Sequence, residues 1–262
     1  MKYALLTVDV ETDWGGRSLI SGKNKGIEEE LPRLLDILGE YGIKATFFIT
    51  ANLLPKYKKE ILKIKANGHE LACHGLEHED VSLLPKHKFE LQLDYCKKLF
   101  KKEIGVNIEG FRAPQFKINK NNLEALSNLG FKYDSSLVKG ILPGRYFNIF
   151  LKNKPFKISR NLTEIPVSST KIIKIPLGLL WINNVGFSFF RFISGLFGLH
   201  DTLVIYMHPF DFSIKKENKL GFLLNKWYHF RQKNVYATLN SLIKYLKENH
   251  YVFLNMKDLE RL

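Results

Sequence analysis

The sequence has only two cysteines, Cys73 and Cys96, and their positions form no pattern of paired spacings. This scarcity excludes a small secreted domain held by disulfides and indicates reduced thiols, as in a cytoplasmic protein. Cys73 precedes a histidine of interest, so it has two interpretations: a metal ligand, or a small buried strand residue. We favour the buried strand residue, because that is the commoner role of a free cysteine.

Low-complexity blocks and uninterrupted apolar runs of membrane-spanning length are also absent. The 262 residues, 45% of them hydrophobic, can bury a sizeable core, so we predict one domain over residues 1–262. The most apolar stretch, 177–199, approaches the length of a membrane span, but Asn183, Asn184, Arg191 and several glycines interrupt it. The first apolar segment reaches Asp9 too early to be a secretory leader, and we therefore predict a cytoplasmic protein.

Acidic residues are outnumbered, because 26 Asp and Glu stand against 40 Lys and Arg and leave a formal net charge of +14. Such a charge indicates an anionic partner: nucleic acid, a phosphate-bearing substrate or an acidic membrane surface. A lysine-rich solvated surface with no special partner explains it equally well. No helix-turn-helix, zinc-finger or RNA-recognition motif is present, so we predict no nucleic-acid partner.

Short apolar runs alternate along the chain with longer segments of helical period, which is typical of parallel βαβ units. The predicted strands are 3–10, 45–50, 70–74, 108–112, 203–208 and 251–255, and the predicted helices are 27–41, 55–67, 85–102, 119–129 and a helix within 235–249. Unusual polar residues follow several of these strands directly. Because the loops of a parallel barrel converge at the strand carboxyl ends, we predict an α/β fold with a barrel of parallel strands rather than an open sheet.

One region, about 146–199, breaks this alternation and reads as an irregular, aromatic insertion. Residues 146–176 predict an irregular hairpin or surface excursion. The stretch 177–199 has two interpretations, an outer helix that packs its aromatic residues on the sheet or an interfacial segment that dips into lipid. The basic, aromatic run at 225–233 favours the lipid contact slightly. Peripheral contact with the cytoplasmic face of a membrane is therefore one of the predicted interactions.

A metal site is predicted by two histidines four residues apart, His74 and His78, which can face one cation from a helix or tight turn. The acidic run that ends the first strand supplies Asp9, Glu11 and Asp13. One carboxylate can bind the ion while another takes a proton from water, and Asp13 is better explained as a cap of the next turn. Two imidazoles and one carboxylate leave coordination positions open, as a hydrolytic metal requires.

Two further polar residues follow apolar strands. Arg112 can keep the general base ionised through a charge-assisted pair, or it is paired at the barrel rim without a catalytic role. His208, with Asp211 three residues later, can donate a proton to a departing amine near neutral pH. His69 precedes its strand and belongs at the opposite end of the barrel, so we interpret it as structural. The remaining histidines have no partnered pattern and receive the same interpretation, namely His87, His200, His229 and His250.

These residues resemble, in motif order, the polysaccharide deacetylases, also called the NodB-homology or carbohydrate esterase 4 family. The resemblance extends from Tyr3 to about Ser136 and again from Leu203 to the C-terminus, and includes the framework segments at 44–49 and 68–70. It implies a distorted (β/α) barrel of about seven parallel strands, a divalent metal and hydrolysis of an N-acyl group from an amino sugar. Zinc is the metal expected first, with manganese, cobalt or nickel as alternatives.

The resemblance also implies a role for each matching residue. Asp9 falls on the general base, and Glu11 on the metal carboxylate, because Val10 occupies the place where many members have a second aspartate. His74 and His78 fall on the two metal histidines, and Arg112 falls on the arginine motif. The late histidine of the family falls on His208, which implies that it protonates the leaving nitrogen.

Three more positions are implied to line the oxyanion or substrate. Pro114 belongs to the arginine motif, which continues Pro114-Gln115-Phe116 where Pro-Tyr-Gly is usual. The backbone N–H of Gln115 can still polarise the tetrahedral oxyanion, because that role does not need the side chain. Asp134 occupies the region of the fourth motif and is implied to tune His208.

The segments 7–12 and 32–38 look most like the branch that includes deformylases of polyprenyl-phosphate-linked amino sugars. The predicted function is therefore a metal-dependent hydrolase that removes an acetyl or formyl group from a carbohydrate, with a lipid-linked or glycan-linked amino sugar as substrate. The alternatives are a peptidoglycan-like or chitin-like oligomer or a cyclic amide as substrate, a glycan- or lipid-binding module that has lost turnover, and a peripheral membrane scaffold. The sequence leaves the oligomeric state open.

Overall fold

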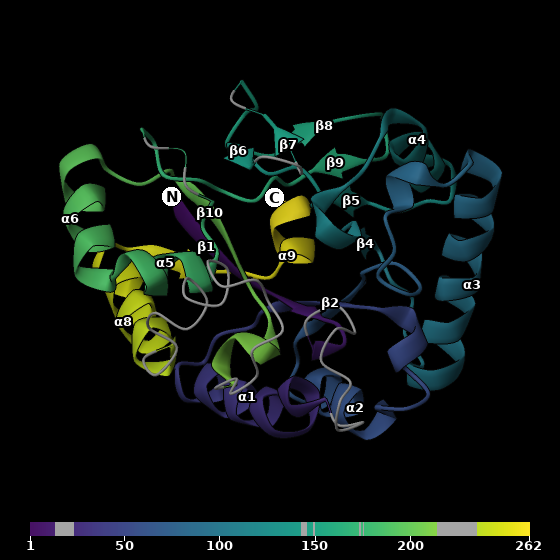
Figure 1. Cartoon of the computed structure of the whole chain (residues 1–262), viewed down its shortest axis with the longest axis horizontal. Helices are drawn as coiled ribbons and strands as arrows, with labels where there is room; N and C mark the ends of the chain where they lie inside the picture. Colours follow the sequence, from purple (N-terminus) through teal and green to yellow (C-terminus); the bar gives the residue numbers. More distant parts are fainter. Residues whose placement is uncertain (14–23, 143–145, 149, 173, 175, 214–234) are drawn as a thin grey trace, which may run out of the picture.

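The chain forms a curved, mainly parallel sheet wrapped by helices, as the computed structural model in Figure 1 shows. The structure describes residues 1–13, 24–142, 146–148, 150–172, 174, 176–213 and 235–262. Helices α1, α2, α3, α6 and α8 lie on the outside, and α9 lies near the axis beside the C-terminus. The predicted α/β barrel is confirmed.

The helices and strands follow one another in an order close to the predicted one. The strands are β1 Lys2–Val10, β2 Thr46–Ile49, β3 Glu70–Cys73, β4 Gly110–Phe111, β5 Tyr133–Asp134, β6 Ile141–Leu142, β7 Tyr146–Phe147, β8 Phe156–Lys157, β9 Thr163–Glu164, β10 Thr202–Met207 and β11 Tyr251–Phe253. The α-helices are α1 Leu31–Glu40, α2 Lys58–Ala66, α3 Lys86–Ile104, α4 Lys120–Asn128, α5 Leu179–Val185, α6 Phe187–Phe197, α8 Val235–Glu248 and α9 Met256–Glu260. Short turns of other helix types are η2 Gly26–Glu30, η3 Ala51–Leu53, η4 Val81–Leu83, η5 Pro114–Phe116 and η6 Pro209–Phe212.

Seven strands of the described chain pair in parallel along one path, β10-β1-β2-β3-β4-β5-β9. The segment after β9 joins the two ends of this path. The Val167 amide donates to the Leu137 carbonyl at 2.9 Å, and the next amide, of Ser168, donates to the Val204 carbonyl of β10 at 3.1 Å. The barrel is thus closed by an irregular segment rather than by a regular strand.

Alternation along β1 divides its side chains between two cores. Ala4, Leu6, Val8 and Val10 belong to the large apolar cluster shared with the helices, whereas Leu5 belongs to a smaller cluster shared with Phe48, Tyr133 and Val204. Since successive side chains of a strand point to opposite faces, Thr7 and Asp9 share the inner face with Leu5. The Asp9 carboxylate, near the end of β1, is therefore directed into the barrel mouth.

Three parts of the chain differ from the sequence prediction. The expected irregular hairpin exists as β8 and β9, but β9 is buried and extends the parallel sheet, so the segment is not a surface excursion. The stretch 177–199 forms two helices rather than one, because Gly186 adopts a φ of +93° between α5 and α6. The strand β5 and the helix α9 were not predicted, since neither has a periodic apolar pattern long enough to detect.

No helix among the described residues has both the length and the apolar character needed to cross a bilayer. The basic, aromatic run at 225–233 lies outside the described residues.

Two glycine substitutions should have opposite effects on stability. A Cβ at Gly110 would lie 1.9 Å from Cζ of the buried Tyr133, so Gly110→Ala should lower the free energy of unfolding by about 3 kcal/mol. A Cβ at Gly39, inside α1, meets nothing within 4 Å. Gly39→Ala should therefore stabilise the protein by about 0.5–1 kcal/mol through helix propensity. Urea unfolding followed by circular dichroism tests both, and equal effects would contradict the close packing of Gly110.

Candidate active site

Polar side chains gather where four neighbouring strands end. Asp9 and Glu11 come from the end of β1, His74 follows β3, Arg112 follows β4 and His208 follows β10. All four strands are adjacent or nearly adjacent on the parallel path, so their carboxyl ends meet at one mouth of the barrel. The structure thus brings together residues that are up to about 200 positions apart in the sequence.

Glu11, His74 and His78 form a cluster that can hold a metal ion. One ligand atom from each lies within 4.8 Å of the other two. Oε2 of Glu11 lies 3.6 Å from Nε2 of His74 and is in contact with Nε2 of His78. Glu11 and His74 are buried, whereas the His78 side chain is 17% exposed. Two imidazole nitrogens therefore face one carboxylate oxygen, and one side of the cluster is open to solvent.

The chemistry of these donors fits a divalent cation. Oε2 of Glu11 is buried and accepts no hydrogen bond from any described residue. Nδ1 of His74 lies 2.8 Å from the Arg112 carbonyl oxygen, and since a carbonyl only accepts, Nδ1 carries the proton. The lone pair of His74 is then on Nε2, toward Glu11, as in metal sites where a backbone carbonyl fixes the ligand tautomer.

The backbone beside His74 is shaped for close packing. Gly75 has a φ of +78°, and a Cβ placed there would lie 3.1 Å from Cγ of Pro114. A glycine therefore lets the loop after β4 approach the histidine loop. His78 itself has a φ of +59°, an unusual conformation for a residue with a side chain.

Electrostatics keep the Glu11 side chain ionised. Burial alone raises the pKa of Glu11, but the imidazoles of His74 and His78, together with His208, outweigh burial and hold this pKa well below its usual range. A carboxylate that stays charged at neutral pH is the form that binds a metal ion.

Arg112 and Asp9 form a buried ion pair beside this cluster. Nη1 of Arg112 donates to Oδ1 of Asp9 at 2.7 Å, and the two side chains are 0% and 2% exposed. The guanidinium also donates to the Thr7 hydroxyl at 2.8 Å, and to the carbonyl and the hydroxyl of Ser135 at 3.1 and 2.9 Å. Its plane lies over the ring of Phe48, with Cζ 4.1 Å from the centroid. Every part of the arginine is therefore fixed, and it fixes Asp9 in turn.

His208 is paired with Asp211, three residues later in the turn η6. Nδ1 of His208 lies 3.4 Å from Oδ2 of Asp211, which also accepts the His208 amide at 2.8 Å. Burial lowers the pKa of His208, but the carboxylate of Asp211, with smaller contributions from Glu11 and Asp9, raises it to about 9. The side chain is 20% exposed and stacks on Phe210. His208 is thus a proton donor at neutral pH.

The loop after Arg112 carries two consecutive residues in the left-handed region, Gln115 at φ +57° and Phe116 at φ +60°. Both have side chains, so this loop stores backbone strain, of about 1–3 kcal/mol per residue. The Phe116 ring packs against Tyr206 and lies near the Arg112 guanidinium. Pro114 lies against Gly75, next to the metal cluster. The loop that carries the Gln115 amide is therefore held at the site.

Asp134 lies below this network rather than at the mouth. Its Oδ1 accepts from the Ser136 hydroxyl at 2.6 Å, and that hydroxyl oxygen accepts the Ala113 amide at 2.8 Å. Asp134 pairs in register with Glu164 across β5 and β9, and both side chains are fully buried. The carboxylate beside His208 is that of Asp211, so the structure does not bring Asp134 to the histidine it was expected to tune.

Comparison with known proteins agrees with this arrangement. The sequence profile described as polysaccharide deacetylase matches residues 2–133, half of the chain. The chain belongs to the polysaccharide deacetylase family. It is 34% identical over 145 residues to a peptidoglycan deacetylase-like protein of Gibberella zeae, a match that covers 51% of this chain and 43% of that protein. It is 28% identical over 138 residues to a peptidoglycan deacetylase of Helicobacter pylori, covering 50% of this chain and 47% of the relative. The chain thus matches less than half the length of these curated relatives.

Solved structures of polysaccharide deacetylases share the fold. A polysaccharide deacetylase from Bacillus cereus superposes with a TM-score of 0.56 at 17% identity, covering 97% of this chain and 92% of the other. A carbohydrate esterase 4 family pseudoenzyme from Bacillus anthracis superposes with a TM-score of 0.60 at 15% identity, covering 99% of this chain and 65% of the other. A mutant of the latter has restored enzymatic activity, so this fold occurs both with and without turnover.

Several residues with weaker signals take structural positions in this deacetylase fold. Nδ1 of His69 accepts the Ala45 amide at 3.2 Å, and burial, with help from Lys44, lowers the pKa of His69 to about 4. Cys73 is buried and is not among the clustered metal ligands of the described chain. Asp13 accepts the Gly26 amide at 3.1 Å at the start of η2. All three structural interpretations are confirmed.

Sequence reasoning missed three partners of Arg112 within the candidate site. Thr7 and Ser135 bind the Arg112 guanidinium, and Phe48 lies beneath it. The position of Thr7, two residues before Asp9 on the same strand face, was a usable signal. Ser135 gave none, because β5 was not recognised as a strand. His229 lies outside the described residues.

The buried pair of Asp134 and Glu164 should make stability depend on pH. Burial and the neighbouring carboxylate raise the pKa of Glu164 well above its usual value, so the folded protein keeps a proton that the unfolded chain loses above about pH 4.5. The free energy of unfolding should therefore fall as the pH rises above that value. Glu164→Gln keeps the shape of the protonated side chain, and its carbonyl can still accept the Leu137 amide, which Oε1 now accepts at 3.0 Å. This variant should show a weaker pH dependence.

The measurement is urea unfolding at a series of pH values from about 5 to 8. Glu124→Gln is the matched control, since Glu124 is 58% exposed in a surface pair with Lys86. An unchanged pH dependence in Glu164→Gln would contradict a proton retained on Glu164 in the folded protein.

Proposed function

We propose that this chain is a metal-dependent hydrolase that removes an N-acyl group, acetyl or formyl, from an amino sugar. The observation that carries the proposal is the juxtaposition of a metal-type cluster, Glu11, His74 and His78, with the buried pair of Asp9 and Arg112. Arg112 joins the two, because its guanidinium binds Asp9 while its carbonyl accepts from His74. Membership in the polysaccharide deacetylase family supports an N-deacylase of carbohydrate.

The proposed cofactor is a divalent ion, zinc first, since two imidazoles and one carboxylate are a common zinc donor set, with manganese, cobalt or nickel as alternatives. When bound, such an ion acts as a Lewis acid toward the acyl carbonyl and makes a water molecule more acidic. Asp9 is the proposed general base that takes the proton from the attacking water. Arg112 pairs with Asp9 and orients it, and it cannot itself act as the base because a guanidinium does not lose its proton.

His208 is the proposed general acid for the leaving nitrogen. The Asp211 carboxylate keeps the imidazole protonated at neutral pH, which is the form that can give a proton to an amine. The backbone N–H of Gln115 is proposed to donate to the oxyanion, and Pro114 to fix the loop that carries it. Asp134 is proposed to act through Ser136, by holding the backbone that follows Arg112.

For the substrate we propose an amino sugar carried by a polyprenyl phosphate. The net charge of +14 supports an anionic substrate. The curated relatives named above, a peptidoglycan deacetylase and a peptidoglycan deacetylase-like protein, support a competing substrate. An oligomer of the peptidoglycan or chitin type is the competing substrate, and a panel of water-soluble N-acyl amino sugars, oligomers and lipid-linked sugars discriminates between them. The cytoplasmic location inferred from the sequence remains a prediction.

Two observations favour a second candidate, a binding module that does not hydrolyse its ligand. Pseudoenzymes exist on this fold, and Glu11 stands where the family pattern has an aspartate. Stoichiometric metal with no amine release from any N-acyl sugar in the panel would favour this candidate.

Two substitutions should separate metal binding from hydrolysis. Asp9→Asn keeps the hydrogen bond geometry with Arg112 but removes the base, so it should retain the metal and lose activity about a thousandfold. His74→Ala removes a ligand and should lose both. Metal content is measured by atomic emission after dialysis, and hydrolysis by release of free amine. Normal turnover in Asp9→Asn would overturn the base assignment.

The pH profile should report His208. Since the pKa of His208 is raised to about 9, the activity should fall as the pH rises through that value, because the imidazolium is the acid. Asp211→Asn removes the carboxylate that raises this pKa, so the alkaline limb should move toward 6.5, the ordinary histidine value. The asparagine carbonyl can still accept the His208 amide, so the turn should persist. An alkaline limb that does not move would exclude His208 as the acid.

A further inference from the structure

A long part of the chain outside the active site contains no acid. Between Glu164 and Asp201 there are 36 residues without Asp or Glu, in a chain that has 26 acids in total. This stretch includes α5 and α6 and carries the cations Lys171, Lys174 and Arg191. The absence of acids indicates a surface that meets negative charge.

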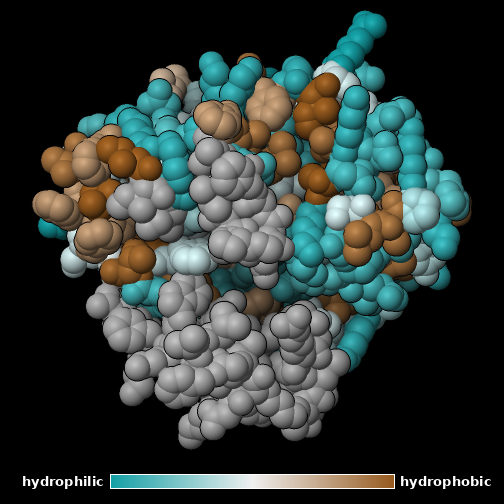
Figure 2. Space-filling view, turned by 45° about the horizontal axis from the view of Figure 1, so that its top comes forward, coloured by the Kyte–Doolittle hydropathy of each residue, from teal (hydrophilic) through white to brown (hydrophobic). Residues whose placement is uncertain are grey.

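Helix α6 has one face packed on the protein and one face left open. On the inner face, Phe190 is 4% exposed and packs with Phe187 and Tyr245 of α8. The outer face of α6, together with Val185 at the end of α5, forms what we call the α6 surface. It consists of Val185, Phe189, Phe192, Leu196 and Phe197, with exposed fractions of 36%, 47%, 66%, 62% and 38%. Figure 2 shows hydrophobic residues gathered at the left edge of the molecule, where Figure 1 places α6.

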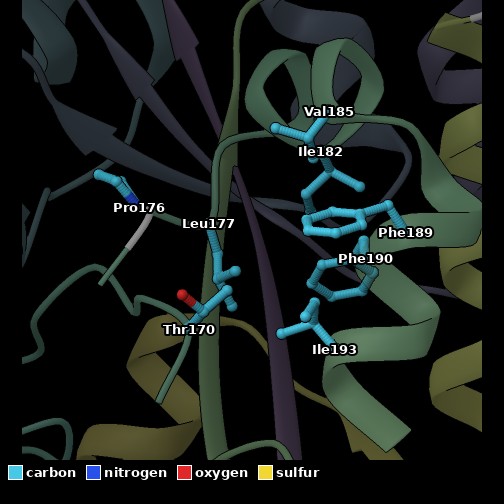
Figure 3. Close-up of a pocket in the computed structure, with 8 residues that line it drawn as sticks. All are labelled: Thr170, Pro176, Leu177, Ile182, Val185, Phe189, Phe190 and Ile193. Atoms are coloured by element: carbon cyan, nitrogen blue, oxygen red, sulfur yellow. The ribbon is translucent and has the colours of Figure 1, made fainter. Parts of the chain in front are cut away.

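The α6 surface is a shallow surface and not the entrance of a deep pocket. Under Phe189 lies a cavity of about 20 Å³, lined on one side by Thr170 and Leu177 and on the other by Phe190 and Ile193 (Figure 3). That volume holds about one water molecule and excludes an acyl chain. The residues Ser188, Arg191, Phe192, Gly195 and Leu196 line a second, open hollow on the outer face. A ligand of the α6 surface must therefore lie across α6 rather than enter the cavity beneath Phe189.

The cations lie close to these aromatic residues. Arg191 is exposed on α6, next to Phe192 in the sequence. Nζ of Lys171 would lie 3.1 Å from a Cβ at Gly198, so this lysine borders the end of α6. Ile172, 57% exposed, follows Lys171 at the same turn. Apolar side chains with flanking cations and no acid are the composition of a helix that lies in a bilayer interface.

The α6 surface is also connected to the barrel mouth. Helix α5 joins α6 directly through Gly186, and Nε1 of Trp181 in α5 donates to the Tyr206 hydroxyl at 3.2 Å. Tyr206 lies two residues before His208 on β10 and packs against its ring. A membrane in contact with α6 would therefore adjoin the side of the site formed by β10.

We propose that the α6 surface binds the face of a bilayer containing anionic lipid. Phenylalanine side chains enter the boundary of the acyl chains, while Arg191 and Lys171 remain at the level of the phosphates, where each cation near an anionic surface contributes favourably. A second copy of the chain is a poorer occupant. In a two-fold dimer the same patch meets itself, so Arg191 and Lys171, which border the α6 surface, would approach the same cations of the second copy. The proposal deepens the proposed function, since it supplies the surface on which a lipid-linked substrate would be presented.

Vesicle flotation tests the proposal. The intact chain should float with vesicles of phosphatidylcholine containing about one third phosphatidylglycerol and much less with pure phosphatidylcholine. The variant Phe189→Ser/Phe192→Ser/Leu196→Ser should bind the anionic vesicles at least about tenfold more weakly. Arg191→Gln/Lys171→Gln should lose the difference between the two lipid compositions. Phe190 is left unchanged, because it is buried and its loss would disturb folding.

Leu83→Ser/Leu91→Ser is the matched control. These leucines are 79% and 68% exposed, and Leu91 lies on α3, across the barrel from α6 (Figure 1). This control should float like the intact chain, and near-ultraviolet circular dichroism should confirm that all variants fold. Absence of flotation, or equal flotation of the triple variant, overturns the proposal. A second outcome also overturns the proposal: light scattering shows a dimer of the intact chain, the triple variant is monomeric, and neither protein binds vesicles.

Metal content and amine release from a water-soluble N-acyl amino sugar distinguish this inference from the proposed function. The triple variant should keep both at the level of the intact chain, because no residue of the α6 surface belongs to the site. Flotation that fails while hydrolysis persists overturns the membrane surface alone. Flotation without any hydrolysis overturns the enzymatic function alone.

Discussion

The buried pair of Arg112 and Asp9 is the interaction on which the rest of the site depends. An unpaired charge in the barrel interior would cost several kcal/mol, so each partner requires the other, and the arginine needs its additional acceptors, Thr7 and Ser135. These acceptors belong to β1 and to the end of β5, so the guanidinium ties two strands together across the mouth. The backbone carbonyl of the same residue orients His74. One residue therefore determines the geometry of the proposed base and of a proposed metal ligand.

The barrel gives this pair its surroundings through simple alternation. Along β1 the even-numbered side chains pack toward the helices and the odd-numbered ones toward the axis, which leaves Asp9 facing inward. The inner core is small, and Phe48 forms the apolar floor under the guanidinium. At the other end, α9 is held by Thr46 and Glu70, which accept the amides of Met256 and Lys257. The polar mouth is thus supported by a packed interior rather than by an open channel.

Much of this architecture was predictable from the sequence, and the reasons are local. The strands β1, β2, β3 and β10 each form an apolar run that ends at a polar residue, so both their existence and the site at their ends could be predicted. The strands β5 and β9 contain two residues each, too few for any periodic signal, whereas β4, which is equally short, lies within the predicted strand 108–112. The closing segment after β9 is identified only by hydrogen bonds to distant strands. Asp211 was noted three residues after His208, but its contact with the imidazole depends on the geometry of η6.

The double use of Arg112 has a consequence for how this fold changes over time. A substitution of its side chain strands the buried Asp9 carboxylate, whereas the backbone carbonyl that accepts from His74 is present whatever the side chain. Glu11 and His78 carry no comparable structural burden, because their side chains contact each other and the His78 side chain is partly exposed. Substitutions at Glu11 or His78 can therefore abolish the proposed reaction while the barrel still folds. Inactive proteins with the same fold should for this reason be common.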